Sequence, residues 1–227
     1  MLFMKLWNKI NNEELKELLK NSSEERVTLS FYKYYHLEDP QAFRDSFFMA
    51  LDGIGVFGRI YVSQEGVNGQ ISVPKVNFGL FEEILDQTGW LKGIRLNYAI
   101  EDDGKSFYKL KIKVRNKIVA DGLNDDSFDV TKRGRHLSAY EVNELLEKED
   151  TIVVDMRNHY ESEVGHFEGA ICPDVETFRD ALPVVEEMLA HDKDKTIVMY
   201  CTGGIRCEKA SAYYLHRGFS EVCMIDG

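Results

Sequence analysis

The sequence predicts a two-domain protein, in which an α+β domain is followed by an α/β domain with a mainly parallel sheet. From residue 27 to 100, strand-like and helix-like segments follow in the order βαββαβ. After residue 137, short continuous apolar strands alternate with helices, which is typical of a sheet covered on both faces. Residues 120–136 are polar and contain two glycines, so we expect domains at 1–119 and 137–227 joined by this linker.

The elements of the first domain follow from periodicity and turn residues. Aromatic and β-branched residues favour strands, whereas Pro40 suits the first turn of a helix. The βαββαβ order predicts a ferredoxin-like sandwich of two helices on an antiparallel sheet. The expected elements are helix 11–20, strand 27–35, helix 40–51, strands 56–62 and 69–73, helix 76–87 and strand 94–100.

A strictly alternating segment, 107–119, follows this unit. Its apolar residues Leu110, Ile112 and Val114 point one way, and four basic residues point the other way. Two interpretations stay open: an edge strand whose charges deter aggregation, or a basic ribbon that follows a phosphate backbone. The four basic residues are Lys109, Lys111, Lys113 and Arg115.

In the second domain, buried strands are expected at 151–155, 196–200 and 222–225, with helices from 138 and over 175–191. Ser138 and Glu141 form a capping-box pattern at the start of the first of these helices. The last strand is followed at once by the final residues. Because a sheet of this kind needs a further covering helix, we expect the native chain to continue beyond residue 227.

The sequence YCTGGIRC at 200–207 is the strongest chemical signal. Cys201 ends an apolar strand, and a loop of four residues separates it from Arg206 at the start of a helix. Backbone N–H groups and the positive end of the helix dipole favour a thiolate there. The short ring suits a sulfane sulfur better than a phosphate ester, and an inert packing cysteine is the alternative. The loop residues are Thr202, Gly203, Gly204 and Ile205.

Composition narrows the class of protein. The chain has 227 residues, of which 44% are hydrophobic and 30% charged, as in ordinary globular proteins. It shows no apolar run of the roughly 18 residues that span a membrane and no signal-peptide pattern. Its four cysteines match no zinc-binding spacing, which predicts reduced thiols in a cytoplasmic protein.

Charge is distributed unevenly. Residues 137–227 hold 8 Lys/Arg and 19 Asp/Glu and so carry the equivalent of the whole net charge of −11. Residues 105–117 hold six basic residues and no acidic one. The acidic average therefore does not exclude nucleic acid as a partner of the first domain.

The second domain resembles the rhodanese family, through Asp155-Met156-Arg157, the GHFEGA sequence at 165–170 and the CTGGIR loop. With EGVNG at 65–69, KLKIKVRNKIV, DMRNHYE and CTGGIRCEKAS, residues 27–227 resemble the bacterial tRNA uridine hydroxylase family, formerly uncharacterised rhodanese-domain proteins. This resemblance implies oxygen-dependent hydroxylation of the tRNA wobble uridine to 5-hydroxyuridine. It also implies a persulfide-forming Cys201 and dioxygen as co-substrate. Many family members carry a cysteine-rich tail, which this sequence lacks.

The residues suggest specific roles. Arg206 and the loop amides would stabilise the anion of Cys201, whose sulfur we hypothesise adds to C6 of uridine. Asp155 and Arg157 would brace the loop, and Cys207 is either a resolving thiol or a packing residue. Glu65 and Asn68 form either a hairpin turn or a lip that contacts a single-stranded or flipped base. The basic residues at 109, 111, 113 and 115 are further candidates for substrate binding.

No cofactor is identified, because the sequence has no GxGxxG, no two-His-one-carboxylate spacing, no haem motif and no metal-ligand set. The expected partner is the anticodon region of tRNA, with no membrane, and a sulfur- or electron-donor protein is left open. Two alternatives remain: a sulfurtransferase or persulfide carrier, and a non-catalytic tRNA- or protein-binding module. A phosphatase is disfavoured by the short loop.

Overall fold

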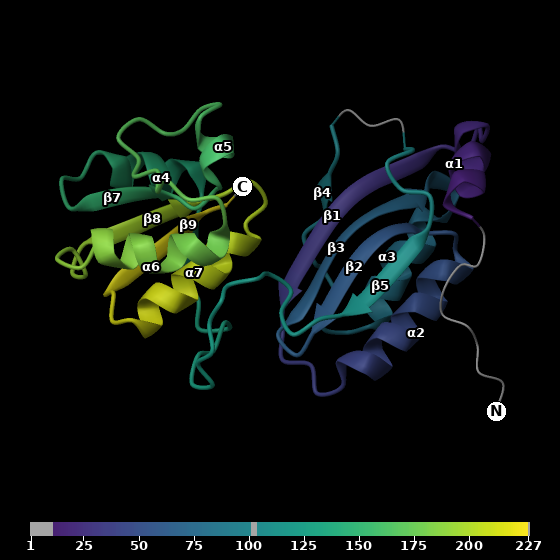
Figure 1. Ribbon diagram of the computed structural model, residues 1–227, viewed down its shortest axis with the longest axis horizontal. Helices are drawn as coiled ribbons and strands as arrows, with labels where there is room; N and C mark the ends of the chain where they lie inside the picture. The colour runs from purple at the N-terminus through teal and green to yellow at the C-terminus, as the bar shows by residue number, and fades with distance from the viewer. Residues whose placement is uncertain (1–10, 101–103, 227) are drawn as a thin grey trace. The chain divides into compact units, whose positions relative to one another are not determined.

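The structure, a computed structural model, describes residues 11–100 and 104–226. The chain divides into two compact units, residues 1–118 and 119–227, here called the first and second domains (Figure 1). Each domain contains its own sheet.

The first domain is a five-stranded sheet in the order β4-β1-β3-β2-β5. Strands β1 to β4 pair antiparallel, which confirms the βαββαβ prediction, and β5 adds to β2 in parallel as an edge strand. Its elements are α1 (Asn12–Lys20), β1 (Arg26–Tyr34), α2 (Pro40–Gly53), β2 (Phe57–Ser63), β3 (Gly66–Pro74), the 3₁₀ turn η1 (Lys75–Asn77), α3 (Phe78–Gln87), β4 (Asn97–Tyr98) and β5 (Leu110–Val114).

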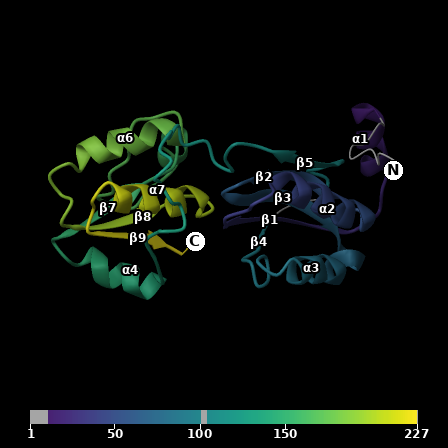
Figure 2. The ribbon, with the colours of Figure 1, turned by 90° about the horizontal axis from the view of Figure 1, so that it is seen from below.

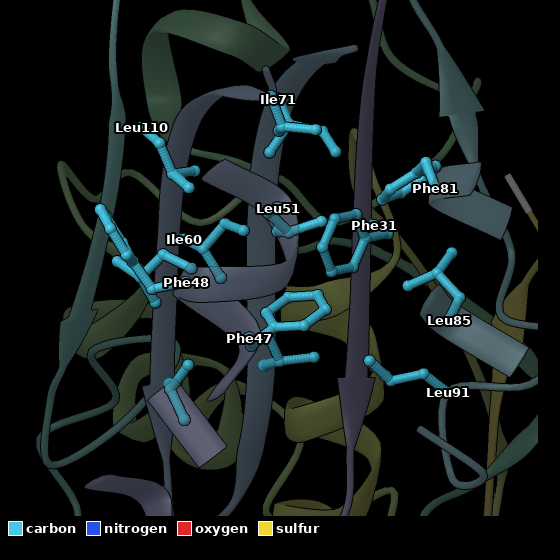
Figure 3. Packing of buried hydrophobic residues seen from close by; sticks show 14 of the residues in the cluster. Phe31, Phe47, Phe48, Leu51, Ile60, Ile71, Phe81, Leu85, Leu91 and Leu110 are labelled. Carbon is cyan, nitrogen blue, oxygen red and sulfur yellow. The ribbon is translucent and has the colours of Figure 1, made fainter. Parts of the chain in front are cut away.

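Helices α2 and α3 cover the same face of this sheet. Phe47 and Leu51 of α2 share one apolar cluster with Phe81 of α3 and with inward-facing strand residues such as Phe31 and Ile60 (Figure 3). Burial of this apolar area supplies most of the driving force for the domain. Since strand side chains alternate, every second residue points to the opposite face.

The hairpin between β2 and β3 is tighter than the sequence predicts. Its turn is only Gln64–Glu65, so Asn68 and Gly69 lie inside β3 rather than in a turn. Gly69 is required by packing, because a β-carbon there would lie 2.7 Å from Cζ of Phe31. The hairpin turn predicted for Glu65 and Asn68 therefore includes Glu65 but not Asn68, and Gly69 serves the packing of the sheet.

Strand β5 is also shorter than the predicted segment 107–119. Leu110 and Ile112 are buried, as alternation predicts, but Val114 is 39% exposed. Val114 is the last residue of this edge strand.

The second domain is a four-stranded parallel sheet in the order β6-β9-β8-β7, which confirms the predicted α/β class. Helices α6 and α7 lie on one face and α4 on the other (Figure 2). Its elements are β6 (Arg135–Leu137), α4 (Ala139–Leu146), β7 (Thr151–Asp155), α5 (His159–Ser162), α6 (Phe178–Met188), β8 (Thr196–Tyr200), α7 (Ile205–His216) and β9 (Glu221–Ile225).

The segment predicted as an interdomain linker, 120–136, is instead part of the second domain. The carboxylate of Asp121 forms an ion pair with the ammonium group of Lys209 in α7 at 2.7 Å, and both side chains are fully buried. Arg133 pairs with Glu208 of the same helix at 2.9 Å, and the segment runs into β6. Most side chains of the segment are exposed, but these two ion pairs join it to α7.

Candidate active site

Cys201 lies at the carboxyl end of β8, where ligands of parallel sheets bind. The loop after it ends at Gly204, which precedes the first residue of α7 and has φ of 82°. That left-handed backbone favours glycine. A β-carbon at Gly203 would meet nothing within 4 Å, so packing does not explain the absence of a side chain there.

The half-buried Cys201 sulfur is surrounded by hydrogen-bond donors. The thiol of Cys207, the backbone N–H groups of Cys207 and Gly203, and the charge of Arg206 together lower the pKa of Cys201 to about 6. These donors outweigh burial, which raises the pKa of a thiol. Near neutral pH the sulfur is therefore mostly a thiolate, the nucleophilic form of cysteine.

Cys207 is the opposite case. It lies in the first turn of α7, and only 1% of its surface is exposed. Burial, followed by its hydrogen bond to Cys201, raises the pKa of Cys207 well above the usual value. It therefore remains protonated and can donate to its neighbour. Its place in the buried apolar cluster of the domain agrees with the packing interpretation, and a role as resolving thiol stays a prediction.

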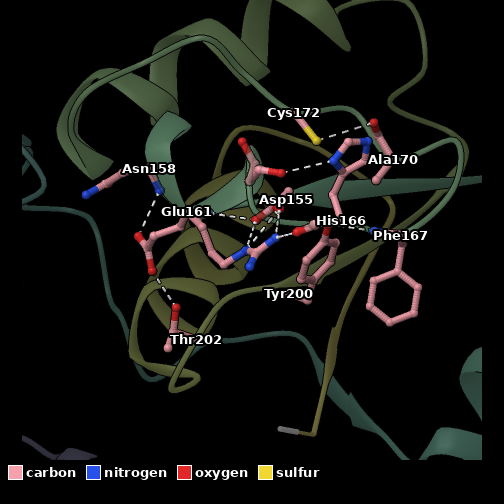
Figure 4. A network of polar contacts seen from close by, with 12 residues as sticks. Asp155, Asn158, Glu161, His166, Phe167, Ala170, Cys172, Tyr200 and Thr202 are labelled. Carbon is pink, nitrogen blue, oxygen red and sulfur yellow. Dashed lines mark hydrogen bonds and ion pairs between the residues drawn. The ribbon is translucent and has the colours of Figure 1, made fainter.

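Arg206 is held by a carboxylate that the sequence analysis did not single out. Glu161 of α5 accepts from Nη1 of Arg206 at 2.7 Å and from Nη2 at 3.0 Å. The hydroxyl of Thr202 donates to the same carboxylate at 2.6 Å (Figure 4). It also accepts from Nη2 of Arg206 at 3.0 Å. Mainly through the Arg206 contacts, the pKa of Glu161 falls to about 2, so the carboxylate stays ionised.

A local signal for Glu161 was present in the sequence. Asn158 and Glu161 have the N-x-x-E spacing of a capping box, and Glu161 accepts from the Asn158 backbone N–H at 3.1 Å. The spacing predicts a helix start. It does not predict that the same carboxylate also binds Thr202 and Arg206, which are more than 40 residues away.

Asp155 and Arg157 form a second polar cluster beside the loop. Asp155, fully buried at the end of β7, accepts from Nε of Arg157 at 2.9 Å and from Nη2 at 2.6 Å. Arg157 also donates to the Gly165 carbonyl at 2.5 Å and lies 5.3 Å from the Tyr200 ring. The pair thus contacts the residue before Cys201 and the segment after α5.

Tyr200 completes this cluster (Figure 4). Its hydroxyl oxygen accepts from the Phe167 backbone N–H at 3.1 Å, and burial raises the pKa of Tyr200 to about 12. Nδ1 of His166 lies 3.1 Å from the Ser162 carbonyl oxygen, an arrangement typical of a structural histidine. Burial raises the pKa values of Cys172 and Cys223, which is the opposite of Cys201.

Glu65 and Asn68 bind the backbone of their own domain. Glu65 accepts from the Ile118 N–H at 2.7 Å, and the Asn68 amide donates to the Ile118 carbonyl at 3.4 Å. Together they hold the segment that follows β5. Base recognition by this pair stays a prediction.

The basic side chains of β5 and its flanks differ in their surroundings. Lys109 donates to the Asn12 side chain of α1 at 2.6 Å, whereas Lys111 and Lys113 are exposed. Arg115 lies 5.6 Å over the ring of Tyr61. The four predicted basic residues therefore do not form one uniform ribbon.

The residues that the structure describes contain neither a group arranged to bind a metal ion nor a helix able to span a membrane. Within residues 11–100 and 104–226, no group of three or more His, Cys, Asp or Glu side chains is arranged to hold a metal ion. Within the same ranges, no helix has the length and apolar character needed to cross a membrane.

Comparison with known proteins identifies the class of each domain. Residues 26–118 match the UPF0176 acylphosphatase-like domain, and residues 138–227 match the rhodanese-like domain. The protein is thus an acylphosphatase-like domain joined to a rhodanese-like domain that carries the Cys201 loop.

Curated relatives share the sequence of almost the whole chain. The chain is 55% identical over 223 residues to the tRNA uridine(34) hydroxylase of Yersinia enterocolitica serotype O:8 / biotype 1B, covering 98% of this chain and 64% of that protein. Against the protein of the same name from Yersinia pestis (strain Pestoides F), identity is again 55%, over 98% of this chain and 63% of that one. This similarity confirms the resemblance seen in the sequence, and the chain spans just under two thirds of these relatives' length.

Similarity to solved structures is weaker. The single domain sulfurtransferase RDL2 of Saccharomyces cerevisiae is 20% identical, with 43% of this chain and 86% of that chain covered and a TM-score of 0.35. A likeness at this level supports no argument about function.

Proposed function

We propose that this protein hydroxylates the wobble uridine of tRNA to 5-hydroxyuridine with dioxygen, using Cys201 as its reactive sulfur. The observation that carries the proposal is the Cys201 loop, in which a protonated thiol, two backbone amides and Arg206 hold a thiolate. Relatives at 55% identity that are named tRNA uridine(34) hydroxylase support the substrate. A tRNA substrate also supports a cytoplasmic location and the anticodon region as the part bound.

The thiolate suits nucleophilic addition to the uracil ring. The sulfur would bond to C6, and the electron pair of the C5=C6 bond would move towards C5 and the C4 carbonyl. C5 then becomes the electron-rich carbon that takes up oxygen. Loss of the C5 proton and breakage of the S–C6 bond would return the thiolate. One oxygen atom enters the base, and the other leaves as water with two electrons and two protons from an external reductant.

Arg206 has a positioning role in this scheme. Its guanidinium is turned by Glu161 and Thr202, so its charge lies beside Cys201 in a defined orientation. Asp155 and Arg157 support the end of β8 through Tyr200. We infer that these residues hold the loop while the sulfur reacts.

The test is nucleoside mass spectrometry of tRNA from a bacterial host that lacks its own uridine hydroxylase and expresses the full chain. Wild type should produce 5-hydroxyuridine in air and none without oxygen, whereas Cys201→Ser should match the empty vector. Cys223→Ala, which removes a thiol from the sheet of the same domain, should retain the product. Product formation by Cys201→Ser would remove the sulfur from the mechanism.

The rhodanese-like domain supports one alternative, transfer of sulfane sulfur. A sulfurtransferase would form thiocyanate from thiosulfate and cyanide through a persulfide on Cys201. Thiocyanate production by wild type, together with no 5-hydroxyuridine in the host tRNA, would favour this activity over hydroxylation.

A further inference from the structure

The sheet of the first domain has a second face, opposite α2 and α3, on which two rows of side chains cross the strands. Strand register defines each row. The first row crosses the neighbouring strands β1, β3, β2 and β5 and consists, in that order, of Ser30, Gln70, Arg59 and Lys111. The next row is Tyr32, Asn68, Tyr61 and Lys113. We call these eight residues the two-row face.

The two-row face lies between two covered ends of the sheet. At one end Ser72 is buried and donates to the Gly104 carbonyl. At the other end the Ile118 backbone is held by Glu65 and Asn68. Asn68 is one of the eight residues and is half-buried at this contact, and the other seven side chains are exposed or half-buried.

Its charge is entirely positive. Arg59, Lys111 and Lys113 are exposed, and within residues 11–100 and 104–226 none of the three forms an ion pair with a carboxylate. The charge of Lys111, then that of Arg115, lowers the pKa of Lys113, which shows how closely these like charges are held. A cluster of unpaired cations on a sheet face is complementary to phosphates.

The two aromatic side chains of this face, Tyr32 and Tyr61, lie in the same row. Asn68 pairs with Tyr32 on one side and with Tyr61 on the other. The Cα atoms of the two tyrosines are therefore two strand spacings, or about 10 Å, apart. The Arg115 guanidinium lies 5.6 Å over the Tyr61 ring and extends its flat surface. Bases of single-stranded RNA stack on such rings, and neighbouring amides such as Gln70 can bind base edges.

We propose that the two-row face binds a single-stranded RNA segment, with bases on Tyr32 and Tyr61 and phosphates on Arg59, Lys111 and Lys113. The proposal deepens the proposed function, because it names a surface of the first domain that would hold the unpaired nucleotides of a tRNA. A duplex fits less well, since its bases are stacked inside and cannot reach the rings.

The experiment measures binding of the full chain to a fluorescent ten-nucleotide oligouridylate by anisotropy at several salt concentrations. Lys111→Gln/Lys113→Gln should weaken binding at least tenfold at low salt. It should also make the slope of log Kd against log salt about 1.4 smaller, because two phosphate contacts are lost. Tyr61→Leu should weaken binding roughly 5- to 150-fold, whereas Tyr61→Phe, which keeps the ring, should stay within about threefold of wild type.

The matched control is Lys75→Gln/Lys92→Gln, which removes the same charge from elsewhere in the first domain and should change affinity less than about threefold. Equal loss in both double variants, wild-type binding by Tyr61→Leu, or equal affinity for a ten-base-pair RNA duplex would overturn the proposal. Cys201→Ser should bind the oligonucleotide like wild type. If the wild-type protein bound the oligonucleotide but formed no 5-hydroxyuridine in cells, the proposed function would be contradicted and this inference would stand.

Discussion

The cations around the Cys201 loop and α7 in the second domain differ from those of the two-row face in the first domain. In the second domain, Arg157, Arg206 and Lys209 each have a carboxylate oxygen within 2.6 to 2.7 Å. On the two-row face of the first domain, the cations have no such partner among the residues described. A paired charge fixes the position of a loop or segment, whereas an unpaired and hydrated charge is available to an external anion. The difference separates residues that build a site from residues that meet a ligand.

The strongest test of this comparison is the buried pair of Lys209 and Asp121. Lys209→Met leaves Asp121 charged and without its ion-pair partner in a fully buried place, so we expect a loss of about 3–5 kcal/mol in the unfolding free energy of the second domain. Amide hydrogen exchange of β8 measures this loss. Tryptophan fluorescence would not, because residues 119–227 contain no tryptophan.

Two further variants serve as controls for the stability loss expected of Lys209→Met. The double variant Asp121→Asn/Lys209→Met removes both charges and should recover more than half of the lost stability. Lys111→Met, on the exposed two-row face, should change stability by less than about 0.5 kcal/mol. Similar effects of Lys209→Met and Lys111→Met would contradict the distinction between paired and unpaired cations.

An effect of intermediate size is expected for the loss of the Cys207 thiol on the pKa of Cys201. Because the pKa of Cys201 is about 6, its alkylation by iodoacetamide should rise with pH through 6 and level off above it. Cys207→Ala removes the main donor to the thiolate, so the midpoint should move up by about one pH unit. Mass spectrometry of the peptide that contains Cys201 follows the reaction separately from the other cysteines.

Cys207→Ser is the matched variant, because its hydroxyl can donate in place of the thiol. Its midpoint should stay closer to 6 than that of Cys207→Ala. If Cys207→Ala also titrates at 6, the backbone amides and Arg206 alone hold the anion.

The smallest effect is expected on the two-row face. Lys111→Gln removes the nearest like charge, so the pKa of Lys113 should rise towards the usual value for lysine. The pH dependence of competitive acetylation at Lys113 measures this shift, and Lys75→Gln is the control. A fall in the pKa of Lys113 would mean that Lys111 does not repel it.

The sequence was sufficient for the fold where the signals were local. The β7 and β8 strands lie at the predicted residues 151–155 and 196–200, because continuous apolar runs in an α/β pattern admit few other structures. Strand β6 was missed because it has only three residues and is polar outside Leu137. The contacts of segment 120–136 with α7 could not be predicted, because Asp121 and its partner Lys209 are 88 residues apart in the sequence.

The candidate site shows the same limit. The Cys201 loop could be found because strand, glycines, arginine and helix are consecutive in the sequence. The part played by Glu161 could not be predicted, since its contacts with Arg206 depend on how α5 and α7 meet in space. The two tyrosines of the two-row face were missed for the same reason, because β1 and β2 become neighbours of β3 only after the sheet forms.

The carboxylate of Glu161 receives a backbone N–H from Asn158, a hydroxyl from Thr202 and a guanidinium from Arg206. Aspartate would be too short to reach all of these groups at once, and glutamine would offer one acceptor instead of two. Position 161 should therefore tolerate almost no replacement over evolutionary time. The exposed lysines at 111 and 113, in contrast, could each exchange with arginine at little penalty.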